Sequence, residues 1–162
     1  MKMMTDEIEA VSRHLEQRLI AYWHDVDFNW GENAAAHYAV DALFLSQTAR
    51  YEGRDQIREF YAWRRERGAR VNVHLVGNFW LKSLTGTRAE ADWICTLYAH
   101  DGEAPQLSAP PIAISRVEDI YVRADQGPWL CRQRSWHSLF RGGVPTTGLT
   151  AKDMARRVAG KG

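Results

Sequence analysis

A histidine and a carboxylate that two different elements could bring together are the residues of this sequence best suited to chemistry. His74 lies in the apolar run Val71 to Trp80, and Asp27 closes an amphipathic stretch that begins near Thr5. A carboxylate beside an imidazole orients the ring, stabilises its charged form and raises its pKa, so that the ring can take a proton from a bound molecule. Asp27 and His74 are therefore our candidate acid–base pair.

The stretch that ends at Asp27 is predicted to be a helix, because its apolar residues recur every three or four positions. They are Ile8, Val11, Leu15, Leu19, Tyr22, Trp23 and Val26. Thr5 is the expected N-cap, and Asp27 is expected at the edge of the buried face. A carboxylate near a helix C-terminus opposes the helix dipole, which indicates that Asp27 is kept there for another reason.

Strands dominate the second half of the chain. Alternating apolar residues predict four antiparallel strands, over 70–82, 87–99, 112–123 and 128–140. Before them we expect a short helix over 32–38, a strand over 42–46, and a helix between Gly53 and Gly68. The first long strand should present one mixed face, made of Asn72, His74, Val76, Asn78 and Trp80. Helices first and strands later predict an α+β fold, a curved sheet with helices on its concave side.

Composition limits the classes of function. The chain has 162 residues, 45% of them apolar, and a net charge of +1, so one globular domain fits and no electrostatic case exists for nucleic acid or an anionic membrane. The 7 Trp, 6 Tyr and 5 Phe either fill a core or line a pocket for a flat apolar ligand. Cys95 and Cys131 are expected as free buried thiols, although an oxidising compartment would let them pair. No signal peptide or membrane-spanning stretch is recognisable, so the cytoplasm is the expected location.

Metal and phosphate chemistry find little support in the sequence. His24, Asp25 and Asp27 are ligand types, but one helix cannot aim all three at a single ion, so no metal site is predicted. No glycine loop joins a strand to a helix in the way that phosphate binding requires. We therefore expect no cofactor.

The remaining charged residues have mostly structural interpretations. The basic run from Arg64 to Arg70 is expected to be a solvated helix end, and Arg123 is expected to pair with Asp119 across strands or at the surface. Arg134, on the last strand, is the cation expected to orient an anionic or carbonyl group of a bound molecule.

An ordered set of short matches resembles the SnoaL-like branch of the nuclear transport factor 2 superfamily. The matches are Tyr22, Val26-Asp27, Asp41 to Phe44, Tyr51 to Arg54, Ile57, Phe60, Arg70, His74 to Asn78, Gly127 to Trp129 and Arg132. The resemblance covers most of 8–140 and implies a cone-shaped barrel, a curved and mostly antiparallel sheet wrapped around N-terminal helices. We place this domain at 1–145. Residues 146–162 form a C-terminal tail, expected to include a short helix over 151–158 that either docks on a neighbour or stays loose.

The resemblance also implies a chemistry. Asp27 and His74 stand where scytalone dehydratase, bile acid dehydratase and hexachlorocyclohexane dehydrochlorinase carry a catalytic Asp–His dyad, and Tyr22 resembles a tyrosine that polarises the substrate in some relatives. The second histidine of scytalone dehydratase has no counterpart here, since residues 111–122 contain no histidine. The residues expected to contact a substrate are Trp23, Trp30, Asn78, Trp80 and Arg134.

The function expected from these observations is that of a small-molecule lyase or isomerase, acting on a hydrophobic, cyclic substrate with the Asp27–His74 dyad in an apolar pocket. Two alternatives stay open: a non-catalytic ligand-binding or oligomerisation module that uses the same cone, and a structural protein resembling the β subunit of ring-hydroxylating dioxygenases. Apolar residues on the convex face of the sheet predict a homodimer or homotrimer.

Overall fold

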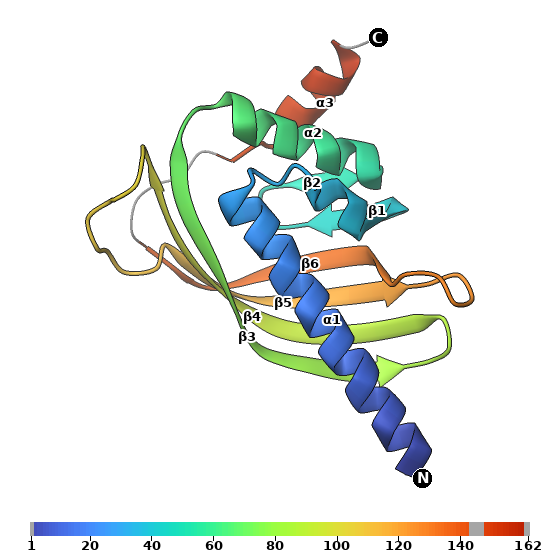
Figure 1. Ribbon diagram of the computed structural model, residues 1–162. Coiled ribbons are helices and arrows are strands. Elements are labelled where there is room, and N and C mark those ends of the chain that lie inside the picture. Colours follow the sequence, from blue (N-terminus) through green and yellow to red (C-terminus); the bar gives the residue numbers. More distant parts are fainter. Residues whose placement is uncertain (1, 143–147, 161–162) are drawn as a thin grey trace.

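One long helix, α1 (Lys2–Phe28), crosses the concave side of a curved sheet in the computed structural model, which describes residues 2–142 and 148–160 (Figure 1). The predicted N-cap at Thr5 is wrong, because the helix begins at Lys2 and Thr5 lies inside it. Lys and Met are good helix formers, which is consistent with a helix that begins before the predicted cap.

The sheet has six strands in the order β2-β1-β6-β5-β4-β3. The predicted antiparallel succession is confirmed by β3 (Arg70–Leu84), β4 (Arg88–Asp101), β5 (Ala113–Val122) and β6 (Leu130–Arg141). In addition, β1 (Tyr38–Leu45) pairs in parallel with β6, and the short β2 (Arg50–Glu52) pairs with β1. The α+β class is as predicted, but β2 and β3 remain as free edges, so the cone is open rather than a closed barrel.

Three smaller helices complete the fold: η1 (Ala34–His37), α2 (Gly53–Glu66) and α3 (Ala151–Ala159). The helix α3 lies against α2 (Figure 1), where Met154 is 1% exposed and Arg157 pairs with Glu59 and Glu66. The helix of the tail therefore docks. The expected boundary at residue 145 and the first two tail residues lie outside the described residues.

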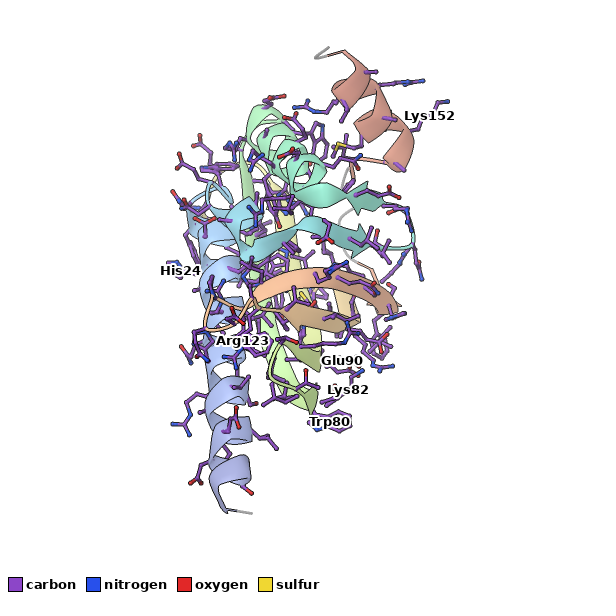
Figure 2. The ribbon with its side chains drawn as sticks, turned by 90° about the vertical axis from the view of Figure 1, so that its right-hand side faces the viewer. His24, Trp80, Lys82, Glu90, Arg123 and Lys152 are labelled. Carbon is purple, nitrogen blue, oxygen red and sulfur yellow. The ribbon has the colours of Figure 1, made fainter. Side chains whose placement is uncertain are left out.

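A bulge in β3 changes which residues face the inside of the cone. The pairing of β3 with β4 shifts just after Gly77, and Asn78 takes the left-handed conformation with φ of +50°. An inserted residue reverses the alternation of a strand. His74 faces inward before the bulge and Phe79 packs against the core after it, whereas Trp80 is 64% exposed and points away from α1 (Figure 2). The predicted single face holding His74, Asn78 and Trp80 is therefore wrong.

Aromatic side chains fill most of the interior. The largest ones exposed by less than 2% are Trp93, Tyr38, Tyr51, Tyr61 and Tyr121. Cys95 and Cys131 are buried and unpaired, as predicted. Among the described residues, none of the helices combines the length and apolar character needed to cross a bilayer.

Candidate active site

Asp27 and His74 meet on the concave side of the sheet, where the last turn of α1 passes β3. The Oδ1 atom of Asp27 lies 2.6 Å from Nδ1 of His74, and its Oδ2 atom accepts a hydrogen bond from the His74 backbone N–H at 2.7 Å. The two side chains are only 3% and 6% exposed. The structure thus brings together the acid and the base that the sequence suggested.

The contact with Asp27 determines which nitrogen of His74 is free. A carboxylate can only accept, so Nδ1 must carry the hydrogen and Nε2 keeps its lone pair. Within the described residues, no hydrogen bond to Nε2 is present. The indole of Trp23 stacks on the imidazole with ring centroids 3.9 Å apart and planes inclined by 14°. The ring is therefore held in place on one side by a carboxylate and on one face by an aromatic ring.

Burial decides the charge of His74. Desolvation lowers the pKa of His74 below its ordinary value and outweighs the opposing effects of the Asp27 hydrogen bond and charge. The nearby cations Arg64 and Arg70 act in the same direction as burial. The expectation that Asp27 would leave His74 with a raised pKa is therefore wrong, because the ring is far more buried than a strand face would suggest. A lowered pKa keeps His74 neutral near pH 7, which is the form that accepts a proton.

Two residues that the sequence reasoning missed as site residues, Asn72 and Arg64, support the Asp27 carboxylate. The Asn72 Nδ2 atom donates to Asp27 Oδ1 at 2.5 Å, and the Arg64 Nη2 atom donates to Asn72 Oδ1 at 2.9 Å. Asn72 could have been found from its position two residues before His74, on the same strand face. The signal for Arg64 was its helical spacing from Ile57, Phe60 and Tyr61, which puts it on their side of the helix, but the basic run that it opens was expected to be solvated.

Tyr22 is occupied by protein partners. Its hydroxyl lies 3.0 Å from the Tyr38 hydroxyl and also hydrogen bonds to the Tyr61 hydroxyl. Burial raises the pKa of Tyr22 well above its ordinary value, so the phenol keeps its proton. The close packing at Tyr61 depends on Gly31, where a Cβ would come within 2.5 Å of the Tyr61 ring. The structure places Tyr22 in a cluster of tyrosines rather than in contact with the Asp27–His74 pair.

Three of the expected substrate contacts lie on the outside. Trp30 is 46% exposed in the turn that follows α1, Trp80 is 64% exposed, and Asn78 is exposed at the bulge. The structure does not bring these three to His74. Trp23 is the expected contact that it does bring there.

Arg134 is fully buried and bonds to Asp119 and to the tyrosine cluster. Its Nε and Nη2 atoms each lie 2.8 Å from the Asp119 carboxylate, and its Nη1 atom donates to the Tyr38 hydroxyl at 3.2 Å. The Trp93 indole and the Tyr121 hydroxyl also donate to Asp119. Both charges are thus desolvated and paired with each other.

The predicted pair of Arg123 with Asp119 is wrong. Arg123 instead donates to the Gly86 carbonyl and lies over the Trp129 ring, 4.6 Å from its centroid. The reason is strand geometry: Asp119 faces inward with its neighbours at two-residue spacing on β5, whereas Arg123 lies beyond the end of that strand.

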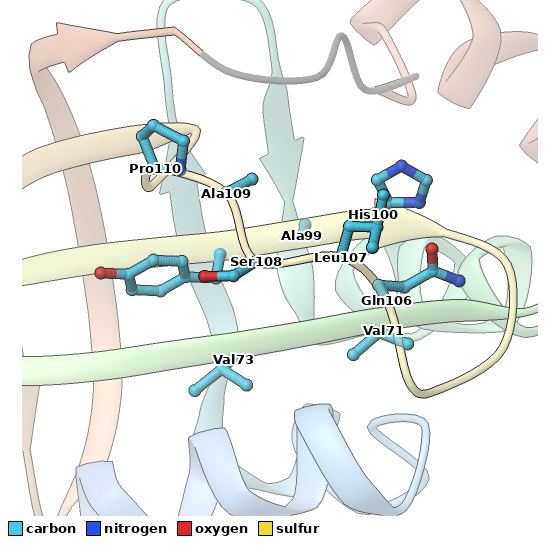
Figure 3. A pocket seen from close by; sticks show the side chains of 10 residues that line it. Val71, Val73, Ala99, His100, Gln106, Leu107, Ser108, Ala109 and Pro110 are labelled. Carbon is cyan, nitrogen blue, oxygen red and sulfur yellow. The ribbon is translucent and has the colours of Figure 1, made fainter.

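An apolar cavity of about 170 Å³ lies under the loop between β4 and β5 (Figure 3). Its walls are Val71 and Val73 of β3, Tyr98 to His100 of β4, and residues 106–110 of the loop. Val71 and Val73 alternate with His74, so this cavity is on the opposite face of β3. The Asp27–His74 pair does not line this cavity, so the expected placement of the pair in an apolar pocket is not met here.

His37 is a second buried histidine. It is 7% exposed, and its Nε2 atom has no hydrogen-bond partner in the described part of the chain. Burial lowers the pKa of His37 well below its ordinary value, and the charges of Arg134 and Arg18 act in the same direction. The fold therefore holds both His37 and His74 in the neutral form.

Mild acid should destabilise the protein through these two histidines. In the unfolded chain both imidazoles bind protons below about pH 6.5, whereas in the folded chain their pKa values are lower. The free energy of unfolding is therefore highest above that pH and decreases as the pH falls toward the pKa values of the folded state. Each ring can contribute a slope of up to about 1.4 kcal/mol per pH unit.

Urea unfolding between pH 7.5 and pH 5.5 measures this loss. His37→Leu should reduce the pH dependence of the free energy of unfolding by about half, because one of the two imidazoles that take up a proton on unfolding is then missing. The exposed His24 provides a matched control, and His24→Leu should keep the full dependence. An unchanged slope in His37→Leu would contradict the prediction.

The sequence was compared with models of known protein families. The sequence profile of the SnoaL-like domain matches residues 11–135, a range that includes Asp27, Arg64, Asn72 and His74. The chain belongs to the SnoaL-like family. No curated protein matches it significantly in sequence.

Solved structures share the fold of this SnoaL-like protein at low sequence identity. A scytalone dehydratase-like protein from Novosphingobium aromaticivorans is 18% identical with a TM-score of 0.74, over 91% of this chain and 96% of that one. ActVI-ORFA from Streptomyces coelicolor is 14% identical with a TM-score of 0.70, over 83% and 99%. The β subunit of a dioxygenase-like, aromatic-ring-hydroxylating protein from N. aromaticivorans is 12% identical with a TM-score of 0.71, over 88% and 97%. Likeness at these identities shows the fold alone, because this fold carries unrelated functions.

Proposed function

We propose that this SnoaL-like protein is a cofactor-independent lyase or isomerase that acts on a small, hydrophobic, cyclic molecule. The observation that carries the proposal is the buried contact of Asp27 with His74 Nδ1, which leaves Nε2 free and unprotonated. A base that is neutral near pH 7 and fixed in one tautomer suits the removal of a proton from carbon.

The proposed step balances without a co-reactant. His74 Nε2 takes a proton from the carbon next to a carbonyl, and the electron pair of that C–H bond forms a carbon–carbon double bond. In a dehydration the neighbouring hydroxyl leaves with its bonding pair and receives the proton from Nε2 as water. In an isomerisation no group leaves, so the π pair of the carbonyl moves to its oxygen and an enolate forms. The carbonyl then forms again as the enolate takes the proton from Nε2 at another carbon. Asp27 stabilises the imidazolium that forms in between.

Other residues have supporting parts in this proposal. Trp23 stacks on one face of the imidazole and is only 4% exposed, so its part is to hold the base in place. Tyr22 is a hydrogen-bond donor to the substrate only when its contacts with Tyr38 and Tyr61 rearrange. The exposed apolar side chains Leu75 and Trp80 support a homodimer or homotrimer.

A second candidate is a structural subunit, which the likeness to the dioxygenase-like β subunit favours. In that case the cone would serve assembly with another chain and Asp27–His74 would be a structural pair. The two candidates differ in whether the isolated protein can move a proton.

The test is an NMR screen of cyclic β-hydroxy ketones and cyclic enones in D₂O. The lyase or isomerase should give either loss of water or deuterium uptake at the carbon next to the carbonyl, and His74→Gln should abolish both. Binding without exchange or elimination across the panel would favour the ligand-binding alternative. Neither binding nor exchange would favour the structural subunit.

A further inference from the structure

A continuous chain of hydrogen bonds runs from the surface of α2 to the imidazole of His74. Arg64 Nη2 donates to Asn72 Oδ1 at 2.9 Å, Asn72 Nδ2 donates to Asp27 Oδ1 at 2.5 Å, and Asp27 Oδ1 lies 2.6 Å from His74 Nδ1. Asn72 is 7% exposed and the Asp27 side chain is 3% exposed. Water therefore has little access to the middle of this chain.

The chemistry of the two ends determines the orientation of the Asn72 amide. A guanidinium has only donors, so Arg64 must face the amide oxygen. A carboxylate has only acceptor atoms, so the amide nitrogen must face Asp27. An amide is the side-chain group that satisfies both neighbours at once, by accepting on one side and donating on the other. Leucine at this position would remove the acceptor for an Arg64 guanidinium hydrogen and one of the two donors to Asp27 Oδ1.

Arg64 is held in place by the helix that carries it. Its guanidinium carbon lies 5.8 Å from the ring centroids of both Phe60 and Tyr61, one turn earlier on α2. The side chain is partly buried, unlike that of the neighbouring Arg65, which is exposed. The first arginine of the basic run is thus turned toward β3, while the second remains in solvent.

We propose that Asn72 and Arg64 are positioning residues for the base: they hold the Asp27 carboxylate against His74 and thereby fix the tautomer in which Nε2 is free. The effect on turnover rests on the proposed function, but the effect on the imidazole does not. Asp27 Oδ1 accepts from both Asn72 and His74, and Oδ2 accepts from the His74 backbone N–H. Without the Asn72 bond, His74 is the one described residue that still holds the carboxylate, and Oδ1 can turn away from Nδ1 while Oδ2 keeps its contact with the backbone. The ring could then exchange between its two neutral tautomers.

The test combines ¹⁵N NMR of the histidine side chains with turnover. His74 is assigned by its loss in His74→Gln, and three further variants are compared: Asn72→Leu, Arg64→Met and Arg65→Met. In the unaltered protein and in Arg65→Met, the His74 ring should be a single Nδ1–H tautomer with slow hydrogen exchange. In Asn72→Leu and Arg64→Met, both tautomers should be populated, and Nδ1–H exchange should be at least about tenfold faster.

Turnover supplies the second readout. For a substrate found in the screen, Asn72→Leu and Arg64→Met should lower kcat at least about tenfold and leave KM within about threefold. Arg64→Lys should restore part of the loss, because an ammonium group can still donate to the Asn72 oxygen. If Asn72→Leu does not fold, the Arg64 series alone decides, since that residue lies at the surface end of the chain of bonds.

Two results would overturn the inference. One is a single, slowly exchanging His74 tautomer in Arg64→Met, equal to that in Arg65→Met. The other is that Arg64→Met and Arg64→Lys lose the single Nδ1–H tautomer to the same extent. That result would assign the effect to packing of the Arg64 side chain rather than to its hydrogen bond. Absence of turnover with every compound would count against the proposed enzyme but would leave the NMR comparison valid.

Discussion

Replacing His74 with alanine should lower kcat by at least about two orders of magnitude, the usual contribution of a positioned general base. The reason is geometric: no other imidazole shares the Asp27 carboxylate, and the Nε2 atom of His74 is the free basic atom of the pair. The expected loss is in kcat rather than in KM, because the removed group acts on the transition state.

Asp27→Asn should lower kcat by a comparable factor, although the amide has nearly the same shape as the carboxylate. The amide that replaces the carboxylate can present its nitrogen to Nδ1, which favours the tautomer with the hydrogen on Nε2 and removes the base. The variant should also lose the two-donor contact with Asn72 and the His74 backbone. Steady-state kinetics of the two variants against pH is the measurement.

An exposed histidine on the same helix serves as the control for both changes. His24→Ala should retain full turnover, since its ring contacts Phe28 on the outer side of α1 (Figure 2). Unchanged turnover in His74→Ala would leave the ligand-binding or structural alternatives as the better explanation. A large loss in Asp27→Asn alone would point to the carboxylate, not the imidazole, as the reacting group.

The Asp27–His74 pair was predictable because each residue has a clear place in a periodic element. Asp27 follows from helical spacing and His74 from strand alternation, and the resemblance to known dyads selected these two from the other candidates. Helical and strand periods are properties of short segments, so they can be recognised in a sequence without knowledge of the rest of the fold.

The predictions failed where the period itself changes. Strand alternation carried past Gly77 places Asn78 and Trp80 beside His74, but the bulge reverses the two faces there. Asn at the left-handed position was the available signal, since Asn tolerates a positive φ better than other non-glycine residues. The parallel pairing of β1 with β6 joins segments about 90 residues apart, and no local pattern reports such a contact.

Buried charge was the other source of error. Alternation correctly implies that Asp119 and Arg134 each lie on one face of a strand. Because charged residues are usually exposed, Asp119 was predicted to pair with Arg123, and Arg134 was predicted to contact a bound molecule. The structure pairs them instead with each other, with both side chains 0% exposed. Burial works against the charge of Arg134, but the facing Asp119 carboxylate more than offsets it, and the pKa of Arg134 is raised.

This pair leads to the largest expected effect on stability. Asp119→Asn should lower the free energy of unfolding by about 3–5 kcal/mol, because it leaves the Arg134 charge buried without a counter-charge. Urea unfolding followed by tryptophan fluorescence measures the change. If Arg134 instead served mainly to bind substrate, Asp119→Asn would raise KM and leave the unfolding midpoint close to that of the unaltered protein.

A matched pair on the same strand shows whether burial is the cause. Arg132 and Asp41 join β6 to β1 with a distance of 2.8 Å, but their side chains are 51% and 61% exposed. Asp41→Asn should therefore change stability by no more than about 1 kcal/mol. The double variant Asp119→Leu with Arg134→Met should be more stable than either single variant, because it removes both charges and keeps the volume apolar. Equal losses in Asp41→Asn and Asp119→Asn would contradict the argument, since the two pairs differ chiefly in their exposure to water.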